Sequence, residues 1–219
     1  MNCPRPAKLS SLAPLVADSP ISLYWMGFLM ADGHFDSKRN NLAVTLGCKD
    51  TEFLQVLADM LECKLNVYAR LPNNIVQLSV ADTTNFPLIV QKWELESNKT
   101  KFPPTKLPLL SEAQFYSWVI GFIDGDGSID KTGCSGSIVT GVEWGHILTE
   151  ISLRLSCLNL QERGPSQFSK NNSLRLKLTV AALRKLKLHG EDHHLPVLRR
   201  KWDRVSYRIS NTMGAFTGL

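Results

Sequence analysis

A short apolar segment occurs twice in this chain and ends each time in an acid followed by glycine. The first copy spans residues 25–33 and reads WMGFLMADG, and the second spans residues 119–127 and reads VIGFIDGDG. The last acids of the two copies, Asp32 and Asp126, are 94 residues apart. This repeat predicts an internal duplication in which each copy supplies one carboxylate.

Each copy is predicted to lie on a helix. Ser19 is placed to cap the first helix, and Pro20 takes its first position, where the missing N–H costs nothing. Ser111 is placed to cap the second helix, and Gln114 three residues later completes a capping box. The glycine after each acid is predicted to end the helix.

Small residues recur on one face of each predicted helix. Gly27 and Ala31 share a face in the first copy, and Gly121 and Gly125 share the matching face in the second. A glycine inside a helix costs roughly 1 kcal/mol relative to alanine, so its repeated use indicates a steric need. We therefore expect the two helices to form an interface through these small residues, with their backbones in close contact.

Parallel packing of these helices would bring Asp32 and Asp126 together at the carboxyl ends. Both the helix dipole and mutual repulsion disfavour two carboxylates there. A divalent cation relieves both effects, and oxygen ligands suit Mg²⁺ (or Mn²⁺) better than zinc. The predicted ligands are the two carboxylates and the helix-end carbonyls of Ala31 and Gly125. The alternative is a pair of amphipathic helices whose terminal acids are only solvated.

On these residues the chain resembles the LAGLIDADG homing endonucleases, in their single-chain form with two motifs. The second motif is a close match, whereas the first has Met30 where the family has its first acid. The resemblance extends from about residue 20 to residue 208. It implies that Asp32 and Asp126 are catalytic and that Asp124 has a supporting role.

The resemblance also implies a basic residue near each carboxylate, late in each repeat. We place these residues at Lys99 and Lys201, with Lys101 and Arg200 as competing candidates. A nearby lysine stabilises negative charge in the transition state of phosphodiester hydrolysis. The alternative for each lysine is a plain surface cation or a contact to the DNA backbone.

The expected order of elements is helix, hairpin, helix, hairpin, helix, and it occurs twice. It predicts an α+β fold of two pseudo-symmetric αββαββα repeats, whose antiparallel sheets form a saddle around the two central motif helices. The remaining helices are expected at residues 51–63, 86–95, 146–157, 180–188 and 196–209. The hairpins are expected at residues 34–48, 65–80 and 128–144, and around residues 164–172.

Five segments are expected along the chain. Residues 1–18 form a loosely held N-terminal arm, and residues 19–98 form the first repeat. Residues 99–110, which contain Pro103, Pro104 and Pro108, form a stiff linker. The second repeat occupies residues 111–210, and residues 211–219 form a tail.

Positive charge is concentrated late in the chain. The sequence has 25 Lys and Arg against 20 Asp and Glu, a net charge of +5, and residues 163–208 hold 12 basic residues against 3 acids. A local excess of this size predicts a phosphate-binding surface. The alternative is the solvated face of a basic protein.

Residues 174–180 alternate strictly between apolar and polar side chains, which predicts a half-buried strand. Such strands can lie in the major groove, where Arg and Lys bind guanine and Gln binds adenine. The predicted DNA contacts are Lys38, Arg39, Thr45, Arg70, Gln77, Ser79, Thr140, Arg163, Lys170, Arg175, Lys177 and Thr179. Outward polar residues also occur on any half-buried sheet, so the pattern supports DNA binding without being specific to it.

Several other classes are disfavoured. No apolar run is long enough to cross a membrane, and the first residues lack a secretory signal. The five cysteines are scattered, which favours a reducing intracellular compartment, whether organellar, bacterial or archaeal. The histidine-rich residues 189–194 suggest zinc, but Gly190 is expected to break any helix there. We therefore expect a loop near the DNA backbone.

The resemblance implies a monomeric, site-specific endonuclease that makes a double-strand break in a long DNA target by Mg²⁺-dependent hydrolysis. Such cleavage would promote mobility of the intron or other element that encodes the protein. Two nucleic-acid-binding alternatives stay open, namely an RNA maturase acting on its own intron RNA and a DNA-binding regulator that does not cleave. A non-catalytic protein–protein module is a third alternative, and it predicts negligible DNA binding.

Overall fold

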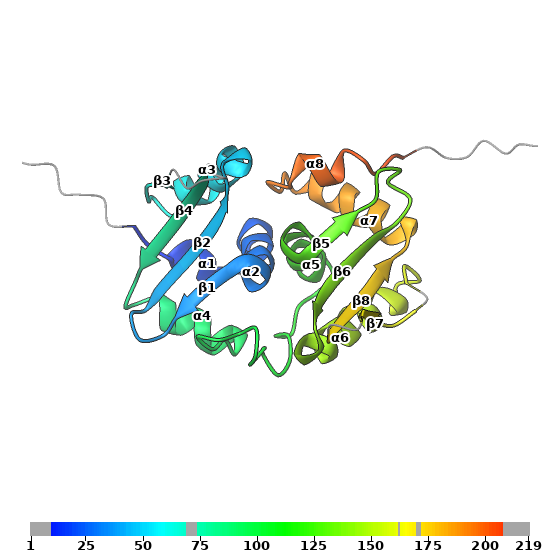
Figure 1. Ribbon diagram of the computed structural model, residues 1–219, viewed down its shortest axis with the longest axis horizontal. Helices are drawn as coiled ribbons and strands as arrows, with labels where there is room; N and C mark the ends of the chain where they lie inside the picture. The colour runs from blue at the N-terminus through cyan, green and yellow to red at the C-terminus, as the bar shows by residue number, and fades with distance from the viewer. Residues whose placement is uncertain (1–9, 69–73, 162, 170–171, 208–219) are drawn as a thin grey trace, which may run out of the picture.

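Two similar halves lie side by side in the computed structural model, with one long helix of each at the centre (Figure 1). The structure describes residues 10–68, 74–161, 163–169 and 172–207. The predicted DNA contacts Arg70 and Lys170 and the predicted tail at residues 211–219 lie outside these ranges. None of the helices in the described residues has the length and apolar character that crossing a membrane requires.

The two halves repeat one order of elements. The first half contains α2 (Pro20–Asp32), β1 (Gly33–Asp36), β2 (Asn41–Gly47), α3 (Thr51–Met60), β3 (Asn66–Tyr68), β4 (Ile75–Ala81) and α4 (Phe86–Trp93). The second contains α5 (Glu112–Asp126), β5 (Gly127–Ile129), β6 (Gly136–Gly141), α6 (Gly145–Cys157), β7 (Ser166–Ser169), β8 (Ser173–Leu178) and α7 (Val180–Asp192). Two short helices, α1 (Ala13–Val16) and α8 (Arg199–Trp202), lie outside the repeat. The predicted α+β duplication is therefore confirmed.

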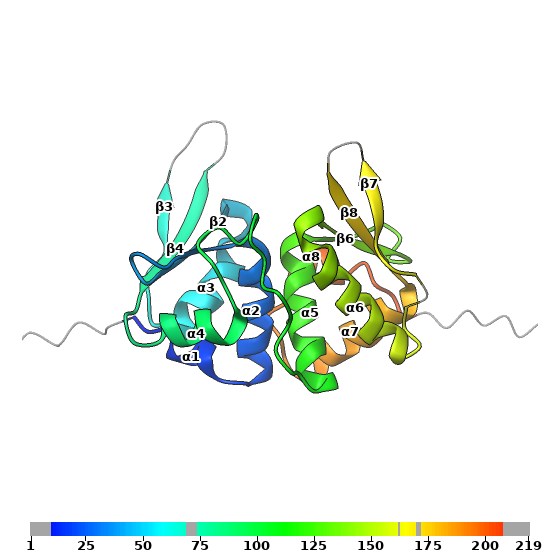
Figure 2. The same cartoon turned by 90° about the horizontal axis from the view of Figure 1, so that it is seen from below.

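Each half contains one antiparallel sheet of four strands. The strand orders are β1-β2-β4-β3 and β5-β6-β8-β7. The registers also correspond, because Val44 pairs with Leu78 in the first sheet and Ile138 pairs with Leu176 in the second. All four side chains are buried, so one face of each sheet packs on the core. The hairpins β3–β4 and β7–β8 rise on the same side of the molecule (Figure 2).

The central contact is between α2 and α5, which run side by side in both views. A Cβ on Gly27 would lie 1.9 Å from the carbonyl oxygen of Trp118, and a Cβ on Gly121 would lie 1.9 Å from that of Tyr24. Any larger residue would therefore force the helices apart. The predicted close approach of the two motif helices is confirmed. Each helix places one glycine against the backbone of the other helix.

The ends of the motif helices agree with the expectation. Ser19 and Ser111 cap the helices as predicted, and the Ser111–Gln114 capping box is present. Gly33 and Gly127 end the helices, each in an extended conformation. Glycine is needed because a Cβ at either position would lie 2.5 Å from a carbonyl oxygen in the last helical turn.

The expectation of a loosely held N-terminal arm is wrong for residues 10–18. Leu12 and Leu15 are fully buried in the core. The backbone N–H of Leu12 also donates to Asp82 Oδ2 at 2.8 Å. The burial of two leucines therefore fixes this segment against the first half.

Two expectations near the C-terminus are also wrong. Helix α7 continues through Gly190, which is buried, and ends at Asp192. The helix expected at residues 196–209 is limited within the described residues to the short α8. Before α8 the backbone is extended at Leu198, whose N–H donates to the buried Asp124 carboxylate at 3.0 Å. This tertiary contact prevents the helix from starting at Pro196.

Candidate active site

Asp32 and Asp126 are the last residues of the two central helices. The carboxyl ends of α2 and α5 point to the side on which the two hairpins rise (Figure 2). Next to the two acids the helices remain in contact, since a Cβ on Gly125 would lie 2.3 Å from the Cβ of Ala31. The structure therefore brings the two carboxylates to one place between the two sheets.

The two carboxylates repel each other. Partial burial and the charge of Asp32 together raise the pKa of Asp126 to about 6, against the opposing effect of Lys99 and Lys201. Burial also raises the pKa of Asp32, which Lys201 and Lys99 lower. Both residues still reach solvent. Two accessible acids whose ionised forms are disfavoured provide a site where a bound cation would be favourable.

Lys99 and Lys201 hold the ends of the two motif helices. Their exposed fractions are only 9% and 7%, although lysine is rarely buried. Lys99 Nζ donates to the carbonyl oxygen of Ala31 at 2.7 Å. Lys201 Nζ donates to the carbonyl oxygens of Asp124 at 2.6 Å and Gly127 at 2.7 Å. Each ammonium group thus caps the negative end of the helix in its own half.

Of the two helix-end acids, each lysine interacts more strongly with the one in the opposite half, although the strongest charge acting on Lys201 is that of Asp124 in its own half. Burial lowers the pKa of Lys99, and Asp126 opposes this more strongly than Asp32 does. Among the charges that lower the pKa of Asp32, Lys201 has the largest effect. Lys99 and Asp126 also line one cavity of about 270 Å³. Each centre therefore combines the acid of one half with the lysine of the other.

The competing basic candidates lie in different surroundings. Arg200 makes an ion pair with Asp50, with Nε 3.1 Å from Oδ1. Its charge also acts on Asp32. Lys101 is exposed beside the Lys99 turn. Arg200 thus belongs to the neighbourhood of Asp32 together with Lys201.

Asp124 occupies a buried position behind the site. Its carboxylate accepts hydrogen bonds from the hydroxyl of Tyr24 at 2.7 Å, from Nε1 of Trp202 at 2.8 Å and from the N–H of Leu198 at 3.0 Å. Burial raises its pKa to about 6. Asp124 therefore joins α2, α5 and the α8 turn that carries Lys201.

The donor set fits a hard divalent cation. Two neighbouring carboxylates offer oxygen ligands, and water can complete the coordination of Mg²⁺. The carbonyl oxygen of Ala31 is already bonded to Lys99, and that of Gly125 lies 3.4 Å from Lys201 Nζ. In the described part of the chain, no cluster of three or more His, Cys, Asp or Glu side chains has a geometry suited to a metal ion. The donor set thus resembles that of a carboxylate-held Mg²⁺ site more than that of a zinc site.

Polar side chains line the outer faces of both sheets. Thr45 pairs with Gln77 on the first sheet, and Ser79 lies two residues further along β4, on the same face. On the second sheet, Arg175 and Lys177 project from the same positions of β8. The first sheet therefore presents neutral groups where the second presents two positive charges.

Two predicted DNA contacts are placed differently. Thr140 is 8% exposed and lies on the core face of β6 with Ile138, so its predicted outward orientation is wrong. Thr179 follows β8 and caps α7, because its hydroxyl accepts from the N–H of Ala182 and donates to the carbonyl oxygen of Leu160. The strand ends before Thr179, so the alternating pattern of residues 174–180 wrongly made Thr179 an outward strand residue.

Three further predicted contacts lie in turns and loops. Lys38 and Arg39 are exposed in the turn between β1 and β2, where Arg39 Nε lies 3.9 Å from Asp36 Oδ2. Arg163 is exposed in the loop before β7. All three side chains are accessible to a polyanion.

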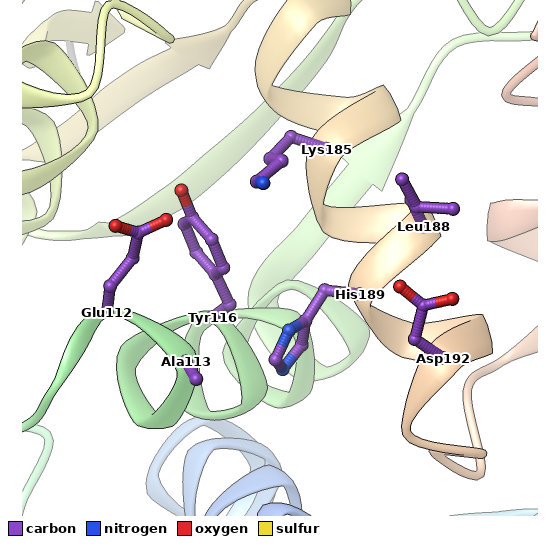
Figure 3. Close-up of a pocket in the computed structure, with 7 residues that line it drawn as sticks. All are labelled: Glu112, Ala113, Tyr116, Lys185, Leu188, His189 and Asp192. Atoms are coloured by element: carbon purple, nitrogen blue, oxygen red, sulfur yellow. The ribbon is translucent and has the colours of Figure 1, made fainter.

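The histidine-rich segment is helical up to Asp192, so the expectation of a loop is wrong. His189 lies beside a cavity of about 270 Å³ near the start of α5, far along that helix from Asp126 (Figure 3). Its Nε2 is 2.8 Å from the hydroxyl of Ser117, and burial lowers its pKa to about 4. His189 is thus a neutral, hydrogen-bonded residue of the helix packing.

Sequence reasoning missed Asp50 and Trp144. These residues are 94 positions apart, as the two catalytic candidates are. Each precedes the helix that follows the first hairpin, and each contacts the late basic segment of the other half. Asp50 binds Arg200, and Trp144 Nε1 donates to the carbonyl oxygen of Lys99 at 3.1 Å. Because an acid and a tryptophan occupy the two equivalent positions, the duplication alone gives no sequence signal that points to them.

Comparisons with known proteins find a similar domain and similar folds. Residues 19–90 match the family model described as a LAGLIDADG-like domain. The chain is similar to the meganuclease I-SmaMI bound to uncleavable DNA, with 14% identity over 81% of this chain and 86% of that chain and a TM-score of 0.52. No curated protein matches the chain.

Two other solved structures have similar folds. The LAGLIDADG homing endonuclease I-GzeII in complex with a DNA target shares 12% identity over 85% of this chain and 87% of its own, with a TM-score of 0.53. The LAGLIDADG homing endonuclease I-LtrWI bound to target DNA shares 13% identity over 86% of this chain and 87% of its own, with a TM-score of 0.52. At such identities the likeness demonstrates the shared fold.

Proposed function

We propose that the chain is a site-specific DNA endonuclease of the LAGLIDADG homing endonuclease family, since residues 19–90 match a LAGLIDADG-like domain and the two-motif fold extends through both halves. The substrate is a long double-stranded DNA target, and the product is a double-strand break. The protein acts as a monomer, because one chain contains both carboxylates. Its repeats correspond to residues 19–98 and 111–210, joined by the linker at residues 99–110.

The observation that carries this proposal is the pair of acids at the parallel helix ends, flanked by two buried lysines. A protein that only binds nucleic acid has no need to place Asp32 beside Asp126, because their repulsion disfavours the folded state. Nor does it need to bury Lys99 and Lys201. The arrangement is well suited to hydrolysis of a phosphodiester.

Asp32 and Asp126 are the residues that would hold Mg²⁺ or Mn²⁺. When bound, such an ion polarises a phosphate oxygen and lowers the pKa of a coordinated water. Lys201 and Lys99 supply positive charge at the Asp32 and Asp126 centres, respectively, and so stabilise charge on the phosphate oxygens as it develops. Asp124 keeps Lys201 in place through its bonds to the α8 segment.

The outer faces of the two sheets and the turns beside them are the proposed DNA-binding surface. Basic side chains bind phosphates or guanine, and the amide of Gln77 suits adenine. The described members of this surface are Lys38, Arg39, Thr45, Gln77, Ser79, Arg163, Arg175 and Lys177. Cleavage by this protein would promote homing of its encoding intron or element in an intracellular compartment.

Selection of cleaved duplexes from a randomised DNA library, with Mg²⁺ present, tests this function. Recovery of one long sequence that the protein cuts in both strands is the expected result. Asp32→Asn and Asp126→Asn are expected to abolish cutting while leaving much of the binding intact. Asp59→Asn is the matched control, because Asp59 is an exposed acid on α3 whose carboxylate accepts a hydrogen bond from Gln55.

Three outcomes contradict the proposal. If the protein binds DNA but leaves every duplex intact with Mg²⁺ or Mn²⁺, it is a non-cleaving regulator. If it leaves its own insertion locus intact but promotes splicing of the intron RNA that encodes it, it is a maturase. Equal cutting by wild type and both Asn variants would show that the activity comes from a contaminant.

A further inference from the structure

The two buried lysines are held by unequal numbers of contacts. Lys201 lies in α8, and its Nζ donates to four backbone carbonyl oxygens at or just after the end of α5, at 2.6 to 3.4 Å. Lys99 lies in the turn after α4, and among the described residues its Nζ has one acceptor, the carbonyl oxygen of Ala31 at 2.7 Å. The position of Lys99 therefore depends more on the contacts that hold its turn.

Trp144 holds this turn from the opposite half. It is the last residue of the 3₁₀ turn η2 (Val142–Trp144), which precedes α6, and it is 5% exposed. Its indole Nε1 donates to the carbonyl oxygen of Lys99 at 3.1 Å. Lys99 Nζ also lies 6.0 Å from the centre of the indole ring, at the outer limit of a cation–π contact. One side chain thus fixes the backbone of Lys99 and lies near its ammonium group.

The indole ring is itself held by the second motif helix. The ring of Phe122 lies 5.7 Å from that of Trp144, and it stacks on Trp118 at 5.1 Å. Phe122 and Trp118 are fully buried residues of α5, the helix that ends at Asp126. Because a close-packed ring has little freedom to move, its N–H group holds the turn at a fixed place relative to α5.

One cavity contains the acid, the lysine and the indole. Asp126, Lys99 and Trp144 all line a space of about 270 Å³. An ammonium group has three donors, and Ala31 accepts from one of them, so two remain for an oxygen of a phosphate in this space. The direction in which Lys99 presents these donors follows from the turn that Trp144 holds.

The Asp32 centre differs at the equivalent position. The residue 94 positions before Trp144 is Asp50, whose carboxylate accepts hydrogen bonds from Arg200. Lys201 needs no anchor of the Trp144 kind, because its own Nζ reaches four carbonyl oxygens. A role of Trp144 in cleavage is therefore confined to one of the two centres.

Packing alone explains Trp144 less well. The buried residues Trp25 and Trp93 fill the core with their rings, and in the described part of the chain their indole N–H groups have no acceptor. The N–H of Trp144 instead donates to the backbone of a candidate catalytic residue of the other half. This bond adds a positional constraint that packing does not require.

We propose that Trp144 is a positioning residue for Lys99, and that its indole holds the ammonium group beside Asp126 while the phosphodiester at that centre is cleaved. Trp144 itself contacts no reacting atom. This inference rests on the proposed endonuclease function. It makes one of the two strand cleavages dependent on Trp144 and leaves the other independent of it.

The test measures each strand separately. The duplex recovered by the cleavage selection carries a different label on each strand, and single-turnover rates are measured with Mg²⁺. Lys99→Gln identifies the strand whose cleavage depends on Lys99. Trp144→Phe keeps an aromatic ring and removes the N–H donor. It is expected to slow that strand about 10-fold, because a displacement of ~1 Å can cost roughly 100-fold and a loosened lysine is displaced for part of the time. The other strand rate and the affinity for the duplex without Mg²⁺ are expected to equal those of wild type.

A double variant separates positioning from general packing. In the Lys99→Gln background there is no ammonium group to position, so Trp144→Phe is expected to cause no further slowing. A merely structural role would slow the strand by the same factor in both backgrounds. Benzothienylalanine at position 144 has the shape of tryptophan with sulfur in place of the N–H group. It preserves the packing if Trp144→Phe unfolds, and the same strand is expected to be slow.

Trp25→Phe is the matched control. Trp25 is buried, packs on Phe53 of α3, and has no acceptor for its N–H group among the described residues. Its replacement removes the same atoms as Trp144→Phe without removing a hydrogen bond. The ratio of the two strand rates is therefore expected to equal that of wild type.

The inference fails if Trp144→Phe and the benzothienylalanine variant leave the ratio of strand rates at its wild-type value. It also fails if Trp144→Phe slows the Lys99→Gln variant by the same factor as wild type, or if Lys99→Gln slows both strands equally. In each case wild type still cuts both strands, so the proposed function stands. If wild type cuts neither strand, the proposed function fails and the inference fails with it.

Discussion

The two halves of the molecule are nearly interchangeable at the central helices and differ where the lysines are held. Gly27 contacts the backbone at Trp118 as Gly121 contacts it at Tyr24, and these pairs share the 94-residue spacing. Near the lysines, the second half has the buried Asp124, whose carboxylate accepts hydrogen bonds. The first half has Met30 at the equivalent position. The duplicated scaffold thus preserves the backbone contact while its side-chain contacts have diverged.

This difference shows which features a duplicated fold must keep. Two helices in backbone contact tolerate no Cβ at the crossing point, so both halves retain glycine there. A lysine can be held in several ways. Lys201 is held through the hydrogen bonds that Asp124 makes to the α8 segment, whereas Lys99 is held by a bond from Trp144 to its carbonyl oxygen.

The largest loss of stability is expected for substitutions at the crossing of α2 and α5, where the two halves are alike. Gly27→Ala and Gly121→Ala each place a methyl group 1.9 Å from a backbone carbonyl oxygen of the facing helix. Each is expected to destabilise the protein by about 3 kcal/mol or more, because backbone must move to relieve the overlap. Urea unfolding monitored by circular dichroism measures the loss.

Gly47→Ala is the control, because a Cβ there would meet no atom within 4 Å. It is expected to unfold close to the wild-type midpoint. If only one of the two interface variants is destabilised, the equivalence of the two halves at the helix crossing is refuted.

The second prediction compares substitutions at Asp124 and Met30, which occupy equivalent positions in the two halves. Asp124→Ala leaves buried donors of Tyr24, Trp202 and Leu198 without their acceptor, which is expected to cost about 3 kcal/mol. Met30→Leu keeps the volume and is expected to cost less than about 1.5 kcal/mol. Thermal unfolding of both variants tests the difference, and similar losses would contradict it.

The features predicted correctly from sequence are those set by local rules. Ser19 and Ser111 cap helices because a hydroxyl three residues before a free N–H needs no distant partner. The contact of Gly27 with α5 was also predictable, because the motif is repeated and glycine is costly inside a helix. Repetition thus supplied the one long-range contact that the sequence could predict.

The features that were missed depend on tertiary partners. The sequence prediction placed Thr140 among the outward DNA contacts, but the burial pattern of β6 places it on the core face. The Lys99 and Lys201 positions were predicted by resemblance, whereas their pairing with the acid of the opposite half depends on the packing of α2 on α5. The Asp50–Arg200 pair joins residues 150 positions apart, and no local pattern indicates it.

A smaller effect on stability is expected from the repulsion between the carboxylates of Asp32 and Asp126, one from each half. The pKa of Asp126 is about 6 in the folded protein, above its ordinary value near 3.9 in an unfolded chain. Between these values the folded state binds more protons, so stability falls as pH rises from about 4 to 6. The full penalty is present above pH 6. Asp126→Asn is therefore expected to stabilise the metal-free protein by about 1 kcal/mol at pH 7.5, since solvent screens an exposed group.

The measurement is chemical denaturation at pH 4 and pH 7.5 in the presence of a chelator. The gain from Asp126→Asn is expected to disappear at pH 4, and the control Asp59→Asn is expected to show no such dependence. Replacing the chelator with Mg²⁺ is expected to stabilise wild type more than Asp126→Asn, because only the wild-type pair binds the ion well. A gain that persists unchanged at pH 4 would exclude charge repulsion as its source.

The smallest expected effect is on the salt dependence of DNA binding, and it concerns the outer faces of the two sheets. Arg175 and Lys177 occupy the positions on β8 that Gln77 and Ser79 occupy on β4. In binding to a random-sequence duplex, Arg175→Gln and Lys177→Gln are each expected to reduce the slope of log affinity against log salt by about 0.9. Gln77→Ala and Ser79→Ala are expected to leave the slope unchanged, because they remove no charge.

The reciprocal variant Gln77→Lys sharpens this comparison, since it gives the first sheet a cation at the position of Arg175. An increase of about 0.9 in the slope would show that the two faces meet the same phosphate backbone and differ only in charge. No increase would show that the first sheet lies away from the phosphates. Arg175 stacks on the ring of Phe168 at 3.3 Å, so its loss also removes a preorganised contact that lysine at position 77 does not recreate. We therefore expect Arg175→Gln to lose more DNA affinity than Gln77→Lys gains. The difference measures the contribution of the preorganised stacking, because both substitutions change the charge by one unit.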